Sequence, residues 1–188
     1  MTNLMIILLV IGGITAVAIL WFISTFNKLV HLKALIEEAW SGIDVQLKRR
    51  YDLIPNLVEV VKQYAGHEKG IFEEVARMRA ASMQSTTIDQ KVEAEKGLTS
   101  ALKTLFAVVE NYPTLKANEN FMSLQKELSN IEHEIQLSRR YYNGASRNYN
   151  ILVQSFPSRI VASYAGYQTV SYFELASVTE RENPRVCF

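Results

Sequence analysis

The sequence predicts an all-α protein in which an N-terminal transmembrane helix is followed by a long antiparallel up-and-down four-helix bundle. The first 27 residues carry no charged side chain, and residues 4–23 are almost uniformly apolar. After residue 27, apolar residues recur at steps of three and four, which is the period of a helix packed on one face. The 188 residues include only 4 prolines and 8 glycines, which disfavours a loop-rich or all-β fold.

The apolar N-terminal stretch has the length of a membrane span. Roughly 20 residues at about 1.5 Å per residue match a hydrocarbon core about 30 Å thick. The alternative is a signal peptide cleaved after Ala16-Val17-Ala18. Against this alternative, no basic residue precedes the stretch, and apolar sequence continues to Ile23. We therefore predict that residues 1–27 are an uncleaved transmembrane anchor.

Charge and cysteine content limit the partners and the location. The chain has 20 basic and 19 acidic residues, so no excess positive charge points to nucleic acid. A single cysteine, Cys187, excludes an internal disulfide and a thiolate metal site. Lys28 and Lys33 follow the anchor, which by the positive-inside tendency favours a single-pass protein of the inner (plasma) membrane with an outside N-terminus and a cytoplasmic bundle. The reverse orientation stays open, because whole domains cross membranes regardless of charge.

The bundle is predicted to occupy residues 28–156. No turn signal separates the anchor from the first bundle helix, so one continuous helix is expected from residue 4 to residue 50. Pro55 predicts a break at residues 51–54 and the start of a second helix. A coiled-coil oligomer is the structural alternative. The further predicted helices cover residues 55–78, 89–111 and 117–156, and residues 157–188 form an apolar and aromatic segment with a polar terminus.

Several stretches resemble the LemA family. Residues 39–58 (AWSGIDVQLKRRYDLIPNLV) resemble the signature block of that family, and residues 109–121 (VENYPTLKANENF) and 139–143 (RRYYN) match it further along. The resemblance extends over residues 27–175. It implies one N-terminal anchor followed by a helical bundle. It implies no known catalytic activity and suggests a role in the organisation of the cell envelope.

No pattern of catalytic or metal-binding residues stands out. In ferritin-like bundles a metal pair needs Glu-x-x-His, and none of the three histidines has a glutamate three residues earlier. Nucleophile elbows and phosphate-binding loops are also missing from the sequence. We therefore expect no cofactor and predict a non-catalytic, membrane-anchored scaffold or adaptor of the bacterial envelope. It is expected to act through protein–protein contacts and self-association, with a homo-oligomer, another membrane protein or both as partners. One alternative is a membrane-bound hydrolase or metal-dependent enzyme that uses His67, Glu68 or residues 49–56 and 111–120 at the remote end of the bundle. The other alternative is a regulator of a membrane protease.

One end of the predicted bundle is a candidate docking tip. In an up-and-down bundle, the first and third turns lie at the same end, here the end remote from the membrane. Tyrosines and asparagines cluster in both turns, where they suit either capping or protein recognition. Arg49 and Arg50 also suit a purely structural role at the end of a helix. The tip residues are Arg49, Arg50, Tyr51, Asp52, Pro55, Asn56, Tyr112, Pro113, Lys116, Asn118 and Asn120.

Two further groups of residues are singled out. Residues 160–173 carry no charge, and we expect their aromatic side chains to pack on the bundle, on the membrane interface or on another subunit in a homo-oligomer. Arg139 and Arg140 flank the apolar stripe of the fourth helix, so a partly buried ion pair with a carboxylate is expected. The tail aromatics are Tyr164, Tyr167, Tyr172 and Phe173, and the candidate carboxylates are Asp44, Glu110 and Glu127.

Overall fold

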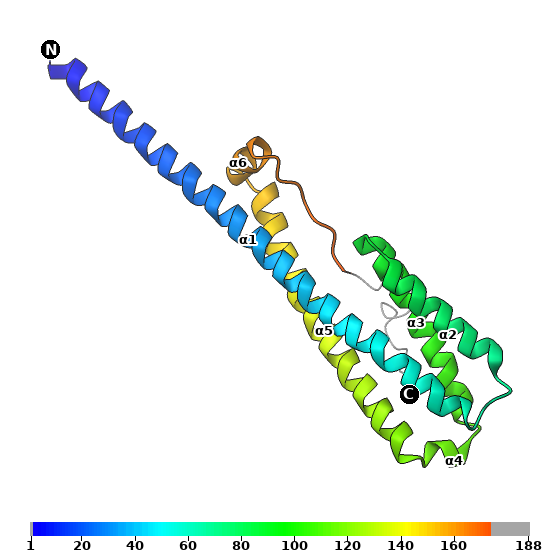
Figure 1. The fold of residues 1–188 in the computed structure, drawn as a ribbon. Helices are drawn as coiled ribbons and strands as arrows, with labels where there is room; N and C mark the ends of the chain where they lie inside the picture. The colour runs from blue at the N-terminus through cyan, green and yellow to red at the C-terminus, as the bar shows by residue number, and fades with distance from the viewer. Residues whose placement is uncertain (1, 174–188) are drawn as a thin grey trace, which may run out of the picture. The chain divides into compact units, whose positions relative to one another are not determined.

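The structure is a computed structural model that describes residues 2–173, and within this range every regular element is a helix (Figure 1). The all-α prediction is confirmed, whereas the four-helix bundle arrangement stays a prediction. The described residues divide into two compact units, residues 2–41 with 140–172 and residues 42–139 with 173. The predicted domain boundaries at residues 27 and 156 also stay predictions. The helices are α1 (Thr2–Lys62), α2 (Lys69–Gln84), α3 (Ile88–Val109), α4 (Pro113–Lys116), α5 (Glu119–Gln154) and α6 (Ser158–Tyr164).

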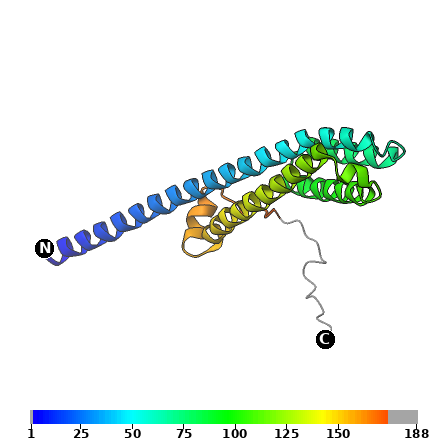
Figure 2. The ribbon, with the colours of Figure 1, turned by 90° about the horizontal axis from the view of Figure 1, so that it is seen from below.

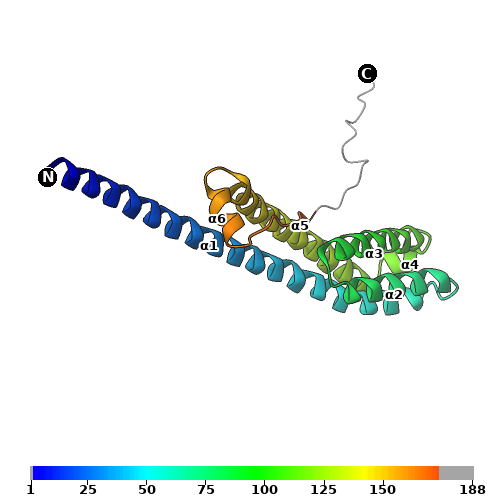
Figure 3. The same ribbon diagram turned by 90° about the horizontal axis from the view of Figure 1, so that it is seen from above.

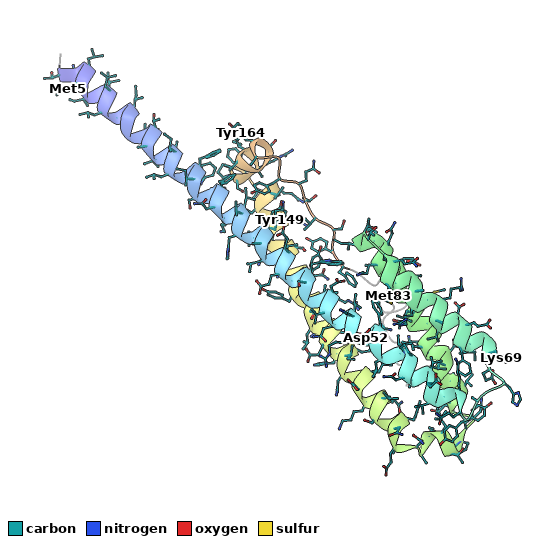
Figure 4. The ribbon with its side chains drawn as sticks, viewed as in Figure 1. Met5, Asp52, Lys69, Met83, Tyr149 and Tyr164 are labelled. Carbon is teal, nitrogen blue, oxygen red and sulfur yellow. The ribbon has the colours of Figure 1, made fainter. Side chains whose placement is uncertain are left out.

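The first part of α1 is apolar and uncovered. Its most apolar 18-residue window has a mean hydropathy of 2.8 and none of its residues is buried, so the helix is long and apolar enough to cross a membrane. The large apolar side chains from Leu4 to Leu20 are each 54–69% exposed. Figure 4 shows side chains projecting around the helix near Met5. An apolar helix surface of this kind is stable in lipid and unfavourable in water.

Helix α1 continues through Pro55, so the predicted break at residues 51–54 is wrong. Pro55 has no N–H to donate to the Tyr51 carbonyl, four residues earlier. Arg79 of α2 supplies the missing donor, because its Nε lies 2.6 Å from that carbonyl oxygen. The buried stripe of Ile43, Leu47, Arg50, Ile54, Leu57 and Val61 also continues across the proline at steps of three and four residues. Tertiary contacts therefore override the local preference for a break.

Helices α2 and α3 form a hairpin in the unit of residues 42–139, and they lie side by side in Figure 2 as in Figure 1. The connection is set by a capping box, in which the Thr87 side chain accepts from the Gln90 N–H and the Gln90 side chain accepts from the Thr87 N–H. Gly97 permits close approach of the two helices, since a Cβ there would lie 2.7 Å from Met78 Sδ. The predicted helix at residues 89–111 corresponds closely to α3.

The short helix α4 leads into α5 (Figure 3). Asn118 begins α5, because its side-chain oxygen accepts the Phe121 N–H at 3.0 Å. The Asn118 amide also donates to the Tyr64 hydroxyl at 3.1 Å, which joins the α1–α2 connection to the start of α5. This end of the unit is therefore built from residues 63–68 and 110–118.

In the unit of residues 2–41 and 140–172, the chain turns sharply after α6. Gly166 has φ of 74°, and the Tyr167 N–H donates to the Ala162 carbonyl while the Gly166 N–H donates to the Ser163 carbonyl. This pair of bonds is the Schellman motif, in which glycine is favoured at the left-handed position. The following extended segment is held on α5 by Asn150, whose side chain bonds both the N–H and the carbonyl of Val170 at 2.9 Å.

Candidate functional site

The most concentrated polar chemistry in the described residues is a buried network between α1, α3 and α5. Arg50 Nη1 donates to Glu95 Oε2 at 3.0 Å, and the Tyr51 hydroxyl donates to the other oxygen of the same carboxylate. Arg50 Nη2 donates to the Thr99 hydroxyl at 3.0 Å, and Arg50 Nε lies 3.0 Å from Glu132 Oε1. The guanidinium therefore makes polar contacts with two carboxylates and a hydroxyl, all within residues 42–139.

Burial makes this network energetically important. Arg50 and Glu95 are each only 2% exposed. A buried ion pair costs desolvation energy to form, but removal of one partner leaves an uncompensated charge in the interior. Burial, followed by the charge of Glu95, raises the pKa of the Tyr51 phenol well above its usual value. Tyr51 therefore stays protonated and acts as a hydrogen-bond donor to Glu95.

An open, mainly apolar groove lies next to this network, between α1 and α2. Its volume is about 580 Å³. Arg79 belongs to both features, because it lines the groove and its Nε binds the carbonyl of Tyr51. The lining combines an apolar floor with charges of both signs: Ile54, Pro55, Val58, Glu59, Lys62, Gly66, Lys69, Phe72, Glu73, Val75, Ala76 and Arg79. A surface of this composition suits the binding of a row of apolar side chains with charges beside it.

Comparison with known proteins places the chain in a family. The model of the LemA family matches residues 39–188, which include the whole network and the whole groove. The chain belongs to the LemA family. This confirms the resemblance that residues 39–58, 109–121 and 139–143 carry.

Curated relatives of this LemA-family chain include magnetosome proteins. It is 26% identical to magnetosome protein MamQ 2 of Paramagnetospirillum magneticum, over 89% of this chain and 71% of the relative. It is 24% identical to magnetosome protein MamQ of Magnetospirillum gryphiswaldense, over 86% and 70% of the two chains. It is also 24% identical to protein LemA of Metamycoplasma hominis, over 84% and 72%. Together with the apolar helix, these matches support membrane association.

The structure separates the two halves of the predicted docking tip of this LemA-family chain. Because α1 continues to Lys62, residues 49–56 lie inside a helix and not at a turn, which corrects their predicted position. Arg50 and Tyr51 are buried in the network, while Arg49, Asp52, Pro55 and Asn56 are exposed. The second half of the tip lies at the end of the unit, and its role as a docking site stays a prediction. It comprises Tyr112, Pro113, Lys116, Asn118 and Asn120.

Two of the three carboxylates predicted to pair with Arg139 and Arg140 have lysine partners. Lys91 Nζ lies 2.6 Å from Asp44 Oδ1, and Lys116 pairs with Glu110. The Arg139 guanidinium lies over the Phe173 ring, 5.4 Å from its centroid. The pairing of the two arginines with Asp44, Glu110 or Glu127 stays a prediction. Arg50 and Glu95 form a buried ion pair that was not among the predicted pairs.

The predicted tail aromatics differ in exposure. Tyr164 lies 5.9 Å from Phe22, and Tyr167 lies 6.2 Å from Phe26, measured between ring centroids. Tyr164 is 82% exposed and Tyr172 is 40% exposed, whereas Phe173 is buried. The tail therefore packs partly against its own unit and leaves Tyr164 uncovered.

Sequence reasoning missed Glu95 and Arg79. Glu95 continues the buried stripe of Leu98, Leu102, Leu105 and Val109 at steps of three and four residues, so a carboxylate on a core position was the available signal. Arg79 had no comparable signal, because its role depends on a carbonyl of another helix. Within residues 2–173, no group of three or more His, Cys, Asp or Glu side chains is arranged to hold a metal ion.

Proposed function

We propose that this LemA-family chain is a non-catalytic membrane-anchored adaptor of the bacterial envelope, which holds a second membrane protein through a helix bound in the α1–α2 groove. The apolar part of α1 would anchor it in the inner membrane. The groove is the observation that carries the proposal, because it offers an open apolar floor beside a rigidly paired polar network. The names of the magnetosome relatives support a role at a membrane.

The dimensions of the groove favour a helix as its occupant. Its lining runs from Ile54 to Lys62 on α1 and from Lys69 to Arg79 on α2. At 1.5 Å per residue these stretches are about 12 Å and about 15 Å long, the length of two to three helical turns. An amphipathic helix would place its apolar stripe on Val58, Phe72 and Val75 and its flanking charges on the rim.

The contribution of the network is structural support. Arg50, Tyr51 and Glu95 contact one another, and Arg79 extends these contacts to the wall of the groove. The groove would therefore be held in one shape before a partner arrives, which lowers the entropic cost of binding. Lys28 and Lys33, which follow the span, favour a cytoplasmic location for the groove.

Photo-crosslinking in intact membranes tests this proposal. A benzophenone amino acid replaces Ala76, an exposed residue that lines the groove, in the full chain. The expected product is a discrete covalent adduct with one other membrane protein, identified by mass spectrometry. The matched control carries the probe at Met122, which is 47% exposed on α5 outside the groove, and should give no such adduct.

The alternatives give different products. A crosslink from Ala76 only to a second copy of this chain would contradict the adaptor role and would favour self-assembly. Equal labelling from Ala76 and Met122 would show that the groove is not a specific site. Recovery of a membrane protease as the partner would support the groove as the binding site and would favour a role as regulator of that protease.

A further inference from the structure

Helix α6 carries an uncovered apolar face. Ile160 and Tyr164 lie four residues apart on α6, at 60% and 82% exposed, and Phe156 lies in the turn before α6 at 84% exposed. All three side chains line the same hollow. The opposite face is packed, since Val161 is 0% and Ala162 is 1% exposed. Three large apolar side chains on one side of a short segment form a patch of the kind that marks a contact surface.

A ring contact shows which part of α1 lies beside this face. The Tyr164 ring meets the Phe22 ring edge to face, with centroids 5.9 Å apart, and Figure 4 shows Tyr164 beside α1. Phe22 lies at the end of the apolar stretch of residues 4–23, and the first charged residue is Lys28. If α1 spans the bilayer, Tyr164 must therefore lie at the boundary between lipid and water, where aromatic residues with a polar tip are favoured.

The patch also contains groups that suit a lipid headgroup. Arg159 and Ser163 line a hollow of about 480 Å³ together with Phe156, Ile160 and Tyr164. They also line a second hollow of about 440 Å³ that includes Tyr167. Among the described residues, neither lining contains a carboxylate. A guanidinium and a hydroxyl beside apolar side chains match a phosphate joined to an acyl chain.

We infer that α6 is an interfacial helix, called the foot below, which lies in the bilayer surface beside the span. Ile160 and Tyr164 of α6, together with Phe156 in the turn before it, contact the upper acyl chains, and Arg159 binds the phosphate of an anionic lipid. The occupant is lipid and not protein, because the contact with Phe22 places the face where lipid already surrounds α1. The inference rests on the membrane span of α1 and is independent of the groove.

Depth-dependent fluorescence quenching tests the foot in the full chain. An environment-sensitive fluorophore is attached at Ile160→Cys in a Cys187→Ser background, and the protein is reconstituted into phosphatidylcholine and phosphatidylglycerol vesicles. Lipids with a nitroxide near the headgroup should quench residue 160 at least about twofold more than a label at Val45→Cys, because only the former lies in the interface. Val45 is a matched control, since it is 54% exposed against 60% for Ile160.

Two further labels separate the possible failures. A label at Ile14→Cys reports the span and should be quenched most by a nitroxide deep in the acyl chain. Quenching of residue 14 without quenching of residue 160 would overturn the foot while the span holds. Energy transfer between residue-160 labels on different copies, in place of lipid quenching, would also overturn it.

The role of Arg159 has its own measurement. Arg159→Gln should reduce quenching of the residue-160 label in vesicles with phosphatidylglycerol, whereas Arg140→Gln, also an exposed arginine, should not. Replacement of phosphatidylglycerol by phosphatidylcholine should reduce quenching in the unsubstituted chain and have little effect in Arg159→Gln. Equal behaviour of both arginine variants would contradict the phosphate contact.

Discussion

At the scale of single residues, the Glu95 carboxylate is the centre of the buried polar network. Glu95 accepts from both Arg50 and Tyr51, and it is 2% exposed. Tyr51 also offers its backbone carbonyl to Arg79, so one residue connects α1 with both α2 and α3. The network therefore holds the α2–α3 hairpin against this part of α1.

Replacement of Glu95 by alanine should destabilise this unit strongly. Arg50 would remain buried with its main counter-ion removed, and losses of about 3–5 kcal/mol are typical when one partner of a buried pair is removed. The measurement is the free energy of unfolding of the full chain in detergent, followed by circular dichroism in denaturant. The control is Lys116→Ala at the exposed pair with Glu110, where less than about 1 kcal/mol is expected. Equal effects of the two variants would contradict a structural role for the network.

Sequence patterning could have located part of this network. Arg50 and Glu95 both occupy positions on otherwise apolar stripes, and two opposite charges on core stripes predict a buried pair. The stripe of α1 continues from Leu47 to Leu57, which is evidence against a break at Pro55. The contact of Arg79 with the Tyr51 carbonyl was not predictable, because it depends on how a separate helix packs.

At the scale of elements, the sequence predicted a helix correctly where the side chains of that same segment determine the structure. The helix at residues 89–111 was predicted, and the structure begins it with a capping box that the sequence encodes locally. The end of α1 was misplaced, since the helix ends at Lys62 and not near Pro55. Helix α6 was missed, because seven residues give too short a periodic pattern.

The turn after α6 should depend on glycine. Gly166 has φ of 74°, and an alanine in this left-handed conformation costs about 1–2 kcal/mol. In Gly166→Ala, hydrogen exchange at the Tyr167 and Val170 amides should be about 5–30 times faster, because both amides are bonded only when the segment is docked. The matched control is Gly144→Ala in α5, where an added Cβ meets nothing within 4 Å and should leave exchange unchanged or slower. Unchanged exchange in Gly166→Ala would contradict this account of the turn.

At the scale of the whole molecule, the chain combines an uncovered apolar helical stretch with a helical part that buries an apolar core. The apolar stretch was predicted from length and composition alone, since a membrane span is a property of local sequence. The LemA-family assignment was also accessible from sequence, through long matches in order. The groove was not, because its walls come from two helices whose boundaries were misplaced. The proposals for the groove and for α6 both require that α1 stays in the membrane.

The most direct test of this requirement is alkaline carbonate extraction of cell membranes, followed by intact mass measurement of the retained chain. We predict that the protein stays in the membrane pellet with its apolar N-terminal stretch attached, at a mass near 21.4 kDa. A freely soluble chain that begins near Ile19 would contradict the account, because neither the anchor nor the foot beside it would then exist.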